Sequence, residues 1–484
     1  TFTQKSHPNT FGPPSLPKQT IVNIEKIDKL INDISKIDLY WKNKPKYVEG
    51  IFFSAHYKDI VPKSRRIGAF LKSDSTDMSQ KIVGAKFSSD KSNHIITYYV
   101  SREAISKTIE EINTVKKIMQ DKFPNGINDT DFERIDKIIK FDNYNISKTK
   151  FMQFIVDANN VEKFNVEENI KDYKESTIVS IYETEKDIID LLKLLDIDVT
   201  PENILPNNTI LLDKNSLEKL NRNASYLIAM SIKDLSEIPA EEKKFNESTL
   251  QNRYIKEPTN EPVIGVIDKP FKQGVYFSNW VKSENIGIPT EAINDVDYNH
   301  GTGVTSIIVD GHRLNPKYDD GCGNFRVRHF GVALGHQFSS FRIIKSIEKI
   351  IEENRDIKVW NLSLGSDKEI NENFISPEAA FLDELQIKYD VIFVIAGTNK
   401  PLNISKKGMK IGAPADSINS LVVNAVDKYN NPTSYTREGE VLSFFVKPDV
   451  SYFGGDSGNE LDGYINVCDN INIEHLTKGT SYSA

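Results

Sequence analysis

The sequence predicts an α/β protein in which a doubly wound parallel sheet fills the C-terminal half and one or more α+β domains precede it. Beyond Pro262, continuous apolar runs of strand length alternate with segments of helical periodicity, as in a parallel sheet covered by helices on both faces. Before that point, apolar residues recur at helical spacing beside short strand-like runs. The 484 residues exceed one ordinary core, so we expect two or three domains.

We divide the chain into five segments. An extended arm rich in Pro, Ser, Thr and Asn comes first, followed by two α+β subdomains, a polar linker and the domain of the parallel sheet. The expected boundaries are 1–20 for the arm, 21–144 and 145–240 for the two subdomains, 241–261 for the linker and 262–484 for the sheet domain.

The N-terminal elements follow from hydrophobic periodicity. In the first subdomain we expect helices at 24–37 and 101–122 and strands at 48–55 and 94–101. In the second, FMQFIVD at 151–157 and TIVSIYE at 177–183 resemble the strands of the first, and a helix is expected to begin near Thr184.

The C-terminal elements are more regular. Helices are expected at 343–351 and 377–390, and the predicted strands lie at 263–268, 325–333, 358–365, 391–397 and 421–427. Parallel sheets bind ligands beyond the carboxyl ends of their strands. Asp268 and the segment from Ser363 to Gly365 fall at such ends, so a site is expected there.

Three short segments of this half carry an acid, an imidazole and a hydroxyl in that order. VIGVID ends at Asp268, NHGTGV contains His300, and GTSYSA contains Ser481. A serine hydroxyl needs a neighbouring base to become a nucleophile, and histidine suits this role because its pKa lies near neutrality. A buried carboxylate then orients the imidazole. The three residue types therefore indicate nucleophilic catalysis by serine.

Each residue alone has a plainer interpretation. An acid at the end of a strand often caps the next turn, and most serines lie in loops or caps. Ser483 is a second candidate serine, but the Gly-Thr-Ser order favours Ser481. The histidines expected to have only surface or packing roles are His312, His329 and His336.

At these segments the chain resembles the subtilisin-like serine proteases, the subtilases. HGTGV is similar to the histidine motif of the family and GTSYSA to its serine motif, and NLSLGS and KPDV agree with two further blocks in family order. The resemblance implies a subtilisin-like fold for 262–484, in a subtilase of bacterial type with a large N-terminal region. It also implies a serine endopeptidase with the catalytic residues Asp268, His300 and Ser481.

The resemblance assigns further roles. Subtilases place an oxyanion-binding asparagine directly after an Ala-Gly pair, where this chain has Thr398 followed by Asn399. We favour Asn399, reached by a one-residue shift of the loop, and keep Thr398 as the alternative. The backbone N–H of Ser481 is the second expected donor. The residues that match the substrate-binding strand of the family are Ser363, Leu364 and Gly365.

Two departures leave alternatives open. In subtilases the serine begins a long helix, whereas this sequence stops three residues later, so we expect a domain truncated after the nucleophile and inactive in that form. Relatives often carry an N-terminal propeptide that assists folding and blocks the cleft, so 145–240 is either propeptide-like or a stable accessory domain. The alternative function is a latent or inactive subtilase that acts as a binding or sensing module through its N-terminal region.

Composition bears on partners. A net charge of −8 argues against a nucleic-acid partner held by bulk electrostatics. No apolar run approaches the ~18 residues of a membrane helix, and no strand is followed by a phosphate-binding glycine loop, which argues against a nucleotide-binding protein. We expect a peptide or protein substrate; a regulatory protein partner stays open.

The first residues show no secretory signal, and two cysteines, Cys322 and Cys468, do not suggest a disulfide framework. We therefore expect a cytoplasmic protein, although a secreted one with its signal removed would begin in the same way. No cofactor is evident, and no His, Cys and carboxylate cluster has the spacing of a zinc site. The resemblance allows structural calcium, at no position that the sequence identifies.

Overall fold

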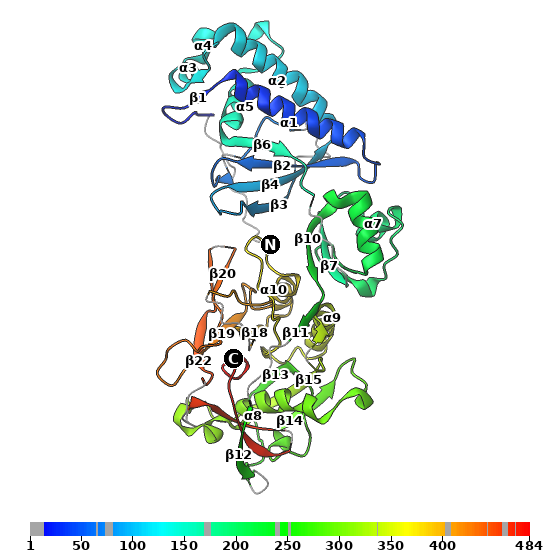
Figure 1. Ribbon diagram of the computed structural model, residues 1–484, viewed down its shortest axis with the longest axis vertical. Coiled ribbons are helices and arrows are strands. Elements are labelled where there is room, and N and C mark those ends of the chain that lie inside the picture. The colour runs from blue at the N-terminus through cyan, green and yellow to red at the C-terminus, as the bar shows by residue number, and fades with distance from the viewer. Residues whose placement is uncertain are drawn as a thin grey trace. The chain divides into compact units, whose positions relative to one another are not determined.

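The computed structural model describes residues 14–63, 66–72, 81–168, 176–237, 243–249, 253–335, 337–401, 408–442, 444–456, 463–469 and 471–484. The chain forms two compact units, which are Thr1–Asp172 with Val179–Ser231, and Tyr173–Ile178 with Ile232–Ala484 (Figure 1). Most of the expected N-terminal arm, 1–13, lies outside the described residues. Within the described residues, none of the helices is long and apolar enough to span a bilayer.

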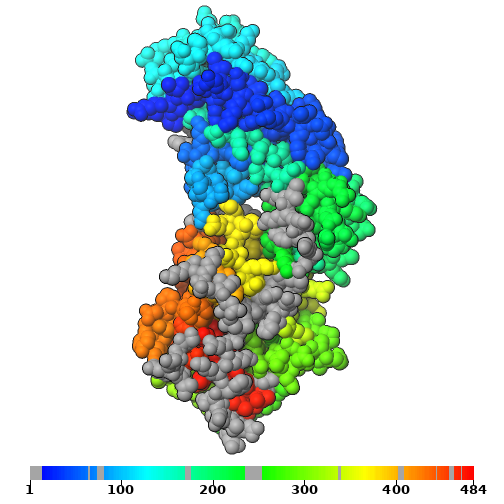
Figure 2. Space-filling view, viewed as in Figure 1, coloured from blue at the N-terminus to red at the C-terminus, as the bar shows by residue number. Residues whose placement is uncertain are grey.

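The first unit is built on an antiparallel sheet of order β3-β4-β2-β6 with helices packed against it; its blue-to-cyan residues form one body in Figure 2. Helix α1 begins where the Asn23 side chain accepts a hydrogen bond from the N–H of Lys26, and its buried residues recur every three or four positions. The elements are α1 (Ile24–Lys42), β2 (Gly50–Tyr57), β3 (Lys81–Phe87), β4 (His94–Ser101), α2 (Glu103–Lys122), α5 (Lys148–Asn160) and β6 (Val161–Asn165). The short pair β1 (Ile21–Val22) and β5 (Ile127–Asn128) and the short helices α3 (Asp129–Glu133) and α4 (Ile135–Ile138) complete it.

The expected strand at 151–157 is wrong, because this segment belongs to helix α5. Ser147 caps the helix by accepting from the N–H of Lys150, and Phe151, Phe154 and Ala158 are buried at helical spacing. Moreover, β6 follows α5 directly and pairs with β2. Elements placed in the segment 145–240 therefore complete the first sheet.

A second small sheet has the order β10-β7-β9-β8. Its first helix, α6, begins at Ile188 rather than near Thr184, because Asp187 is itself the N-cap and accepts from the N–H of Ile189 at 2.8 Å. The elements are β7 (Thr177–Ile181), α6 (Ile188–Leu194), β8 (Ile204–Leu205), β9 (Thr209–Leu212), α7 (Lys214–Ala224) and β10 (Ile228–Lys233).

The second unit contains the predicted parallel sheet. Seven strands in the order β14-β15-β13-β17-β18-β19-β22 all run parallel, which confirms the expected fold class. The strands are β13 (Val263–Asp268), β14 (Val281–Asn285), β15 (Arg326–Gly331), β17 (Val359–Leu362), β18 (Ile392–Ala396), β19 (Leu421–Val426) and β22 (Val450–Phe453).

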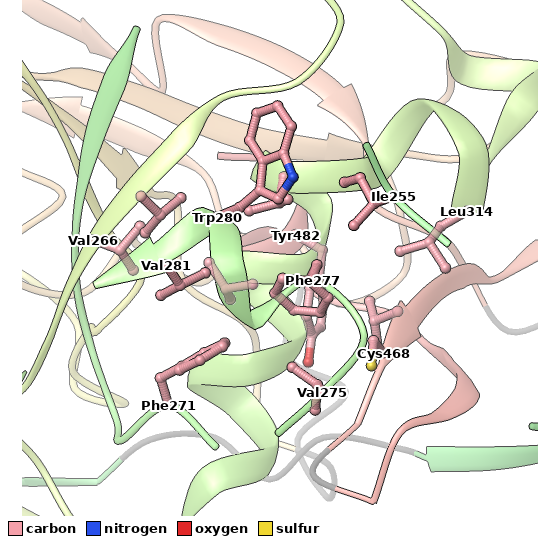
Figure 3. Packing of buried hydrophobic residues seen from close by; sticks show 14 of the residues in the cluster. Ile255, Val266, Phe271, Val275, Phe277, Trp280, Val281, Leu314, Cys468 and Tyr482 are labelled. Carbon is pink, nitrogen blue, oxygen red and sulfur yellow. The ribbon is translucent and has the colours of Figure 1, made fainter. Parts of the chain in front are cut away.

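Helices cover both faces of this sheet. Asn361 of β17 faces a cavity lined by α8 (Tyr298–Leu314), whereas its neighbour Leu362 faces α9 (Ser340–Glu353) and α10 (Pro377–Tyr389). On the α8 side, Val304 and Val309 join an apolar cluster with residues such as Phe277 and Tyr482 (Figure 3). This packing fixes the position of α8.

Part of the expected linker is a strand. Lys243–Thr249 forms β12, which pairs with β24 (Ile473–Thr477), and β24 in turn pairs with β23 (Ile465–Cys468). Segments more than two hundred residues apart in sequence therefore lie side by side (Figure 1). Two further antiparallel pairs are β11 (Leu235–Glu237) with β16 (Gln337–Ser339), and β20 (Gly439–Val441) with β21 (Phe445–Lys447).

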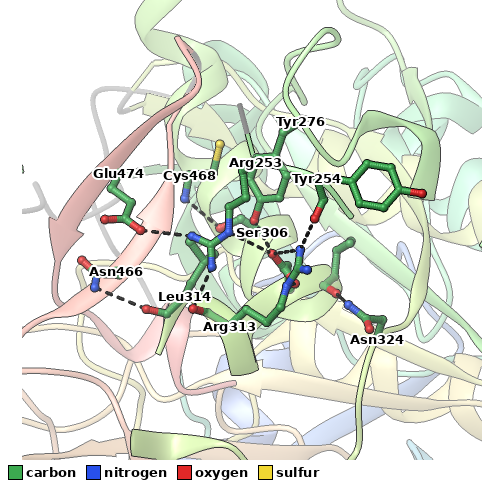
Figure 4. A network of polar contacts seen from close by, with 12 residues as sticks. Arg253, Tyr254, Tyr276, Ser306, Arg313, Leu314, Asn324, Asn466, Cys468 and Glu474 are labelled. Carbon is green, nitrogen blue, oxygen red and sulfur yellow. Dashed lines mark hydrogen bonds and ion pairs between the residues drawn. The ribbon is translucent and has the colours of Figure 1, made fainter. Parts of the chain in front are cut away.

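The residues after β12 are also bound tightly to this unit. Arg253 donates to Glu474 Oε1 at 3.1 Å and to the carbonyl O of Arg313 at 2.7 Å, and Arg313 donates to the carbonyl O of Tyr254 at 3.0 Å (Figure 4). The fully buried Asp310 pairs with Arg313 at 2.7 Å. A segment whose polarity suggested a linker is thus part of the folded domain.

Candidate active site

Asp268 is the last residue of β13 and is fully buried. Its Oδ1 accepts a hydrogen bond from the N–H of Lys269 at 2.6 Å. The strand approaches its neighbour closely, because a Cβ on Gly265 would stand 2.2 Å from the indole ring of Trp360. The carboxylate therefore emerges from a rigid, apolar strand at the carboxyl edge of the sheet.

His300 lies in the first turn of α8 and is only 6% exposed. Its Nδ1 lies 2.5 Å from Asp268 Oδ1. Because an ionised carboxylate only accepts, Nδ1 carries the hydrogen and Nε2 of the neutral ring is the basic atom. The two residues that the sequence analysis paired are thus joined directly, with the ring held in the tautomer that a general base needs.

Gly301 allows this contact. A Cβ at position 301 would lie 2.2 Å from the carbonyl O of Lys269 and 2.8 Å from that of Pro270. The backbone of α8 therefore rests directly on the turn that follows Asp268. Any side chain at 301 would push the helix, and His300 with it, away from the carboxylate.

Ser481 lies in a single 3₁₀ turn, Thr480–Tyr482, at the same edge of the sheet. Its Oγ donates to the carbonyl O of Ser363 at 3.3 Å, and the Ser363 hydroxyl donates to the carbonyl O of Ser481 at 3.1 Å. The ring of the next residue, Tyr482, lies 6.0 Å from the ring of His300, centroid to centroid. The structure thus brings the serine segment against both the substrate-binding candidates and the histidine.

Asn399 is hydrogen-bonded to the serine segment. Asn399 Oδ1 accepts from the N–H and the hydroxyl of Thr480, both at 3.0 Å, which turns the amide Nδ2 away from Thr480. A Cβ on Gly479 would lie 3.3 Å from that Nδ2. The amide of Asn399 therefore stands beside the residues that precede Ser481.

The hydroxyl of Thr398 is used elsewhere. It donates to the carbonyl O of Gly397 at 2.7 Å and accepts from the N–H of Gly412 at 2.9 Å. Thr398 has a φ of +66°, which is unfavourable for a β-branched residue. Asn399 follows this left-handed residue directly.

Arg437 holds the backbone of Asn399 in place. It is buried, and it donates to the carbonyl O of Asn399 at 2.9 Å and to that of Asp367 at 2.7 Å. Burial lowers the pKa of Arg437 to about 10, so its charge persists at neutral pH. This role could not be predicted from the sequence, because the hydrogen-bond partners of Arg437 are backbone carbonyls in loops distant in the chain.

The segment Ser363–Gly365 continues β17 beyond its last paired residue, and Ser363 and Leu364 are buried. A Cβ on Gly365 would lie 2.4 Å from Cγ2 of Thr398, and the N–H of Ser366 donates to the carbonyl O of Ala413 at 2.7 Å. Leu364 and Gly365 also border a small apolar pocket on the α9 side.

The remaining histidines differ from one another. His312 lies in the last turn of α8 beside a cavity, and His336 lies outside the described residues. His329 is fully buried and contacts the turn after Asp268, which the sequence analysis did not anticipate. The described residues contain no group of three or more His, Cys, Asp or Glu side chains suited to a metal ion, so no calcium site is assigned.

The model of the subtilase family, peptidase S8, matches residues 242–484. No curated protein matches the chain.

Similar solved structures include the epidermin leader peptide processing serine protease EpiP from Staphylococcus aureus, which is 17% identical over 64% of this chain and 85% of that chain, with a TM-score of 0.43. The prenylagaramide maturation protease PagA is 16% identical over 48% and 73%, with a TM-score of 0.33. The psychrophilic subtilisin-like protease Apa1 from Pseudoalteromonas sp. AS-11 is 17% identical over 43% of each chain, with a TM-score of 0.30. Because the family model covers half of its length, the chain belongs to the subtilase family of serine peptidases.

Proposed function

We propose that the protein is a serine endopeptidase that hydrolyses peptide bonds through an Asp268–His300–Ser481 triad and an acyl-enzyme intermediate. Membership in the family means that its substrates are peptides or proteins. The observation that carries the proposal is the 2.5 Å bond between Asp268 and His300 at the sheet edge where the serine segment also lies.

In the first half-reaction, Ser481 Oγ attacks the peptide carbonyl carbon while its proton passes to His300 Nε2. Asp268 stabilises the imidazolium through the Nδ1 hydrogen bond. When the tetrahedral intermediate collapses, the C–N bond breaks and the proton on Nε2 goes to the leaving amine. The acyl group stays on Ser481.

In the second half-reaction, His300 takes a proton from water, whose oxygen attacks the acyl carbon. The Ser481–acyl bond then breaks and the proton returns to Oγ. In both tetrahedral intermediates the negative oxygen accepts hydrogen bonds from Asn399 Nδ2 and from the N–H of Ser481. The contact of Asn399 with Thr480 supports this assignment over Thr398.

A peptide-hydrolysis assay of the native protein tests the proposal. Ser481→Ala should abolish cleavage of a fluorogenic peptide, whereas Ser483→Ala, two residues along the same buried segment, should retain the turnover of the parent to a much larger extent. If Ser481→Ala keeps the parental turnover, or if the well-folded parent shows none, the proposed function is wrong.

The alternative, a latent subtilase, is favoured by one observation. Strand β11, from the segment that leaves the small N-terminal sheet, pairs antiparallel with β16 in the register Leu235↔Ser339, Ser236↔Phe338 and Glu237↔Gln337. β16 leads directly into α9, whose first residue, Ser340, shares a pocket with Leu364 and Gly365. A strand of this chain is therefore paired with the segment that leads to the pocket beside Leu364 and Gly365, and under the latent alternative this strand is the inhibitory segment.

Proline substitution in β11 tests whether the protein is an active endopeptidase or a latent subtilase. Proline cannot donate to a strand pair, so Leu235→Pro combined with Glu237→Pro should weaken β11. If β11 keeps the enzyme latent, the double variant cleaves the peptide faster than the parent. Equal or slower cleavage by the folded variant contradicts latency.

A further inference from the structure

A buried histidine outside the proposed triad joins the segments that carry Asp268 and His300. His329 on β15 is 0% exposed. Its Nε2 lies 2.8 Å from the carbonyl O of Lys269, the residue after Asp268, and its Nδ1 lies 2.9 Å from the hydroxyl of Thr305 on α8. One ring therefore bridges the turn that carries the acid and the helix that carries His300.

The hydrogen bonds define which atoms carry protons. A backbone carbonyl only accepts, so Nε2 of His329 carries a hydrogen and donates it to Lys269. The hydroxyl of Thr305 has one hydrogen and two acceptors within reach, the carbonyl O of Gly301 at 2.7 Å and Nδ1 of a neutral His329. Protonation of His329 would change this pattern, because Nδ1–H would then donate to Thr305 and free the hydroxyl hydrogen for Gly301.

Several groups face the ring. Asp268 and the carbonyl of Lys269 lie on the β13 side, His300 and Thr305 lie on α8, and the ring of Phe271 lies 5.7 Å away. Burial lowers the pKa of His329, the negative charge of Asp268 and the bond to Lys269 oppose this, and a charge on His300 adds to it. Burial is the largest of these causes, so the ring is neutral at neutral pH.

His329 lies where helix α8 and the turn after Asp268 approach each other closely. A Cβ on Gly301 would stand 2.2 Å from the carbonyl O of Lys269 and 3.0 Å from Cε1 of His329. The backbone of α8 therefore lies directly against this turn, and hydrogen bonds between the two help to set their spacing. His329 holds both at once.

We propose that His329 is a positioning residue for the proposed reaction, which binds the turn after Asp268 to helix α8 and thereby sets the geometry of the Asp268–His300 pair. This inference rests on the proposed function. It adds a residue that acts through the Asp268–His300 pair.

The test compares two substitutions in the native protein. His329→Phe keeps a buried ring but removes both hydrogen bonds. His329→Gln keeps a donor for Lys269 and an acceptor for Thr305, and it cannot be protonated. We expect kcat for a peptide substrate to fall by about 10–100-fold in His329→Phe with KM unchanged, because the base is misplaced while substrate contacts remain. His329→Gln should recover most of kcat.

The pH–rate profile gives a readout that a merely structural role would not move. A looser Asp268–His300 bond stabilises the imidazolium less, so the acid limb of kcat should move to lower pH in His329→Phe and stay in place in His329→Gln. His312→Gln, at the other end of α8, is the matched control and should leave the limb unmoved. Parental kcat and an unmoved limb in His329→Phe would overturn the proposal.

The same bridge can be broken from the other side. Thr305→Val removes the hydroxyl at nearly constant volume, and Thr305→Ser restores it. The valine variant should reproduce the loss in kcat and the shifted limb, and it carries the test if His329→Phe does not fold. A Thr305→Val protein with parental kinetics contradicts the inference.

A spectroscopic measurement separates this inference from the proposed function. In a Ser481→Ala background, the proton on His300 Nδ1 can be followed by NMR with labelled histidine, without any turnover. Its resonance should shift or broaden when His329→Phe is added and stay unchanged with His329→Gln. If the resonance is the same with and without His329→Phe, His329 does not position the Asp268–His300 pair, whatever the activity of the enzyme. If the parent lacks peptidase activity but the resonance responds to His329→Phe, only the proposed function is wrong.

Discussion

Glu378 should make the second unit less stable as the pH rises through neutrality. It lies in the first turn of α10 and is 5% exposed. Burial raises the pKa of this carboxyl to about 7, the hydrogen bond from Ser340 opposes the shift, and the nearby acids Asp416 and Asp234 add to it. One of its oxygens, Oε2, has no hydrogen-bond partner among the described residues. A charged carboxylate is thus poorly accommodated at this position.

The size of the effect follows from the shift. In the unfolded chain the carboxyl ionises near its ordinary pKa of 4.5, and in the folded protein at about 7. Its contribution to stability is complete below the unfolded value and is lost as the pH rises through the folded value. At about 1.4 kcal/mol per pH unit, the loss above pH 7 amounts to about 3 kcal/mol. Glu378→Gln, which cannot ionise, should recover this amount.

Denaturant unfolding at several pH values measures the difference. A Trp41→Phe background leaves Trp280 and Trp360, both in the second unit, as fluorescence probes of its unfolding. Glu378→Gln should match the parent near the ordinary pKa of glutamate and be more stable above neutrality, while Glu384→Gln, exposed on the same helix, should change nothing. If Glu378→Gln and the parent have equal stability at about pH 8, the reasoning is refuted.

Three further predictions follow from contacts. Gly301→Ala should strongly reduce activity because its Cβ would meet backbone oxygen at 2.2 Å, whereas Gly303→Ala meets its nearest neighbours at 3.4 Å and should keep most of it; equal kcat in a peptide assay would contradict this. Asp310→Ala should lower the free energy of unfolding by about 3 kcal/mol, because Arg313 and the hydroxyl of Tyr276 lose a buried partner, and an unchanged denaturation midpoint would show that the pair does not contribute. Asn399→Ala should lower kcat by about 10²–10³-fold with KM little changed, and a larger loss in Thr398→Ala would favour Thr398 as the oxyanion donor.

The five inner strands of the sheet in the second unit could be predicted because they are largely buried and therefore rich in apolar residues. Apolar composition is a local property, so Val263–Asp268 and the other inner strands are evident in the sequence. The edge strands β14 and β22 are mostly exposed and were not predicted. The acid and the histidine also carried local marks, a charge at the end of an apolar run and a glycine after the imidazole. The structure explains both features: Asp268 is buried at the end of its strand, and Gly301 allows α8 to approach the turn after Asp268 closely.

Other features depend on contacts between distant residues and left no local mark. Residues 151–157 are apolar enough for a strand, and only the spacing of Phe151, Phe154 and Ala158 indicates the helix they form. Strand β12 has a polar sequence, and its place in the fold is set by backbone pairing with β24, which is distant in the chain. His329 could not be distinguished from a packing histidine, since its partners Lys269 and Thr305 are far away in sequence.

The choice between Asn399 and Thr398 shows the same limit. The two residues are adjacent, and which one reaches the serine segment depends on the left-handed backbone at Thr398 and on the bond from Arg437. Neither is visible in the Ala-Gly-Thr-Asn sequence itself.

The most direct measurement of the central claim is mass-spectrometric mapping of the residue that a fluorophosphonate modifies in the native protein. We predict a single modified hydroxyl at position 481, formed far more slowly when the imidazole at 300 is replaced by the methyl group of alanine. Modification of another residue, or a rate that does not depend on that imidazole, would contradict the account.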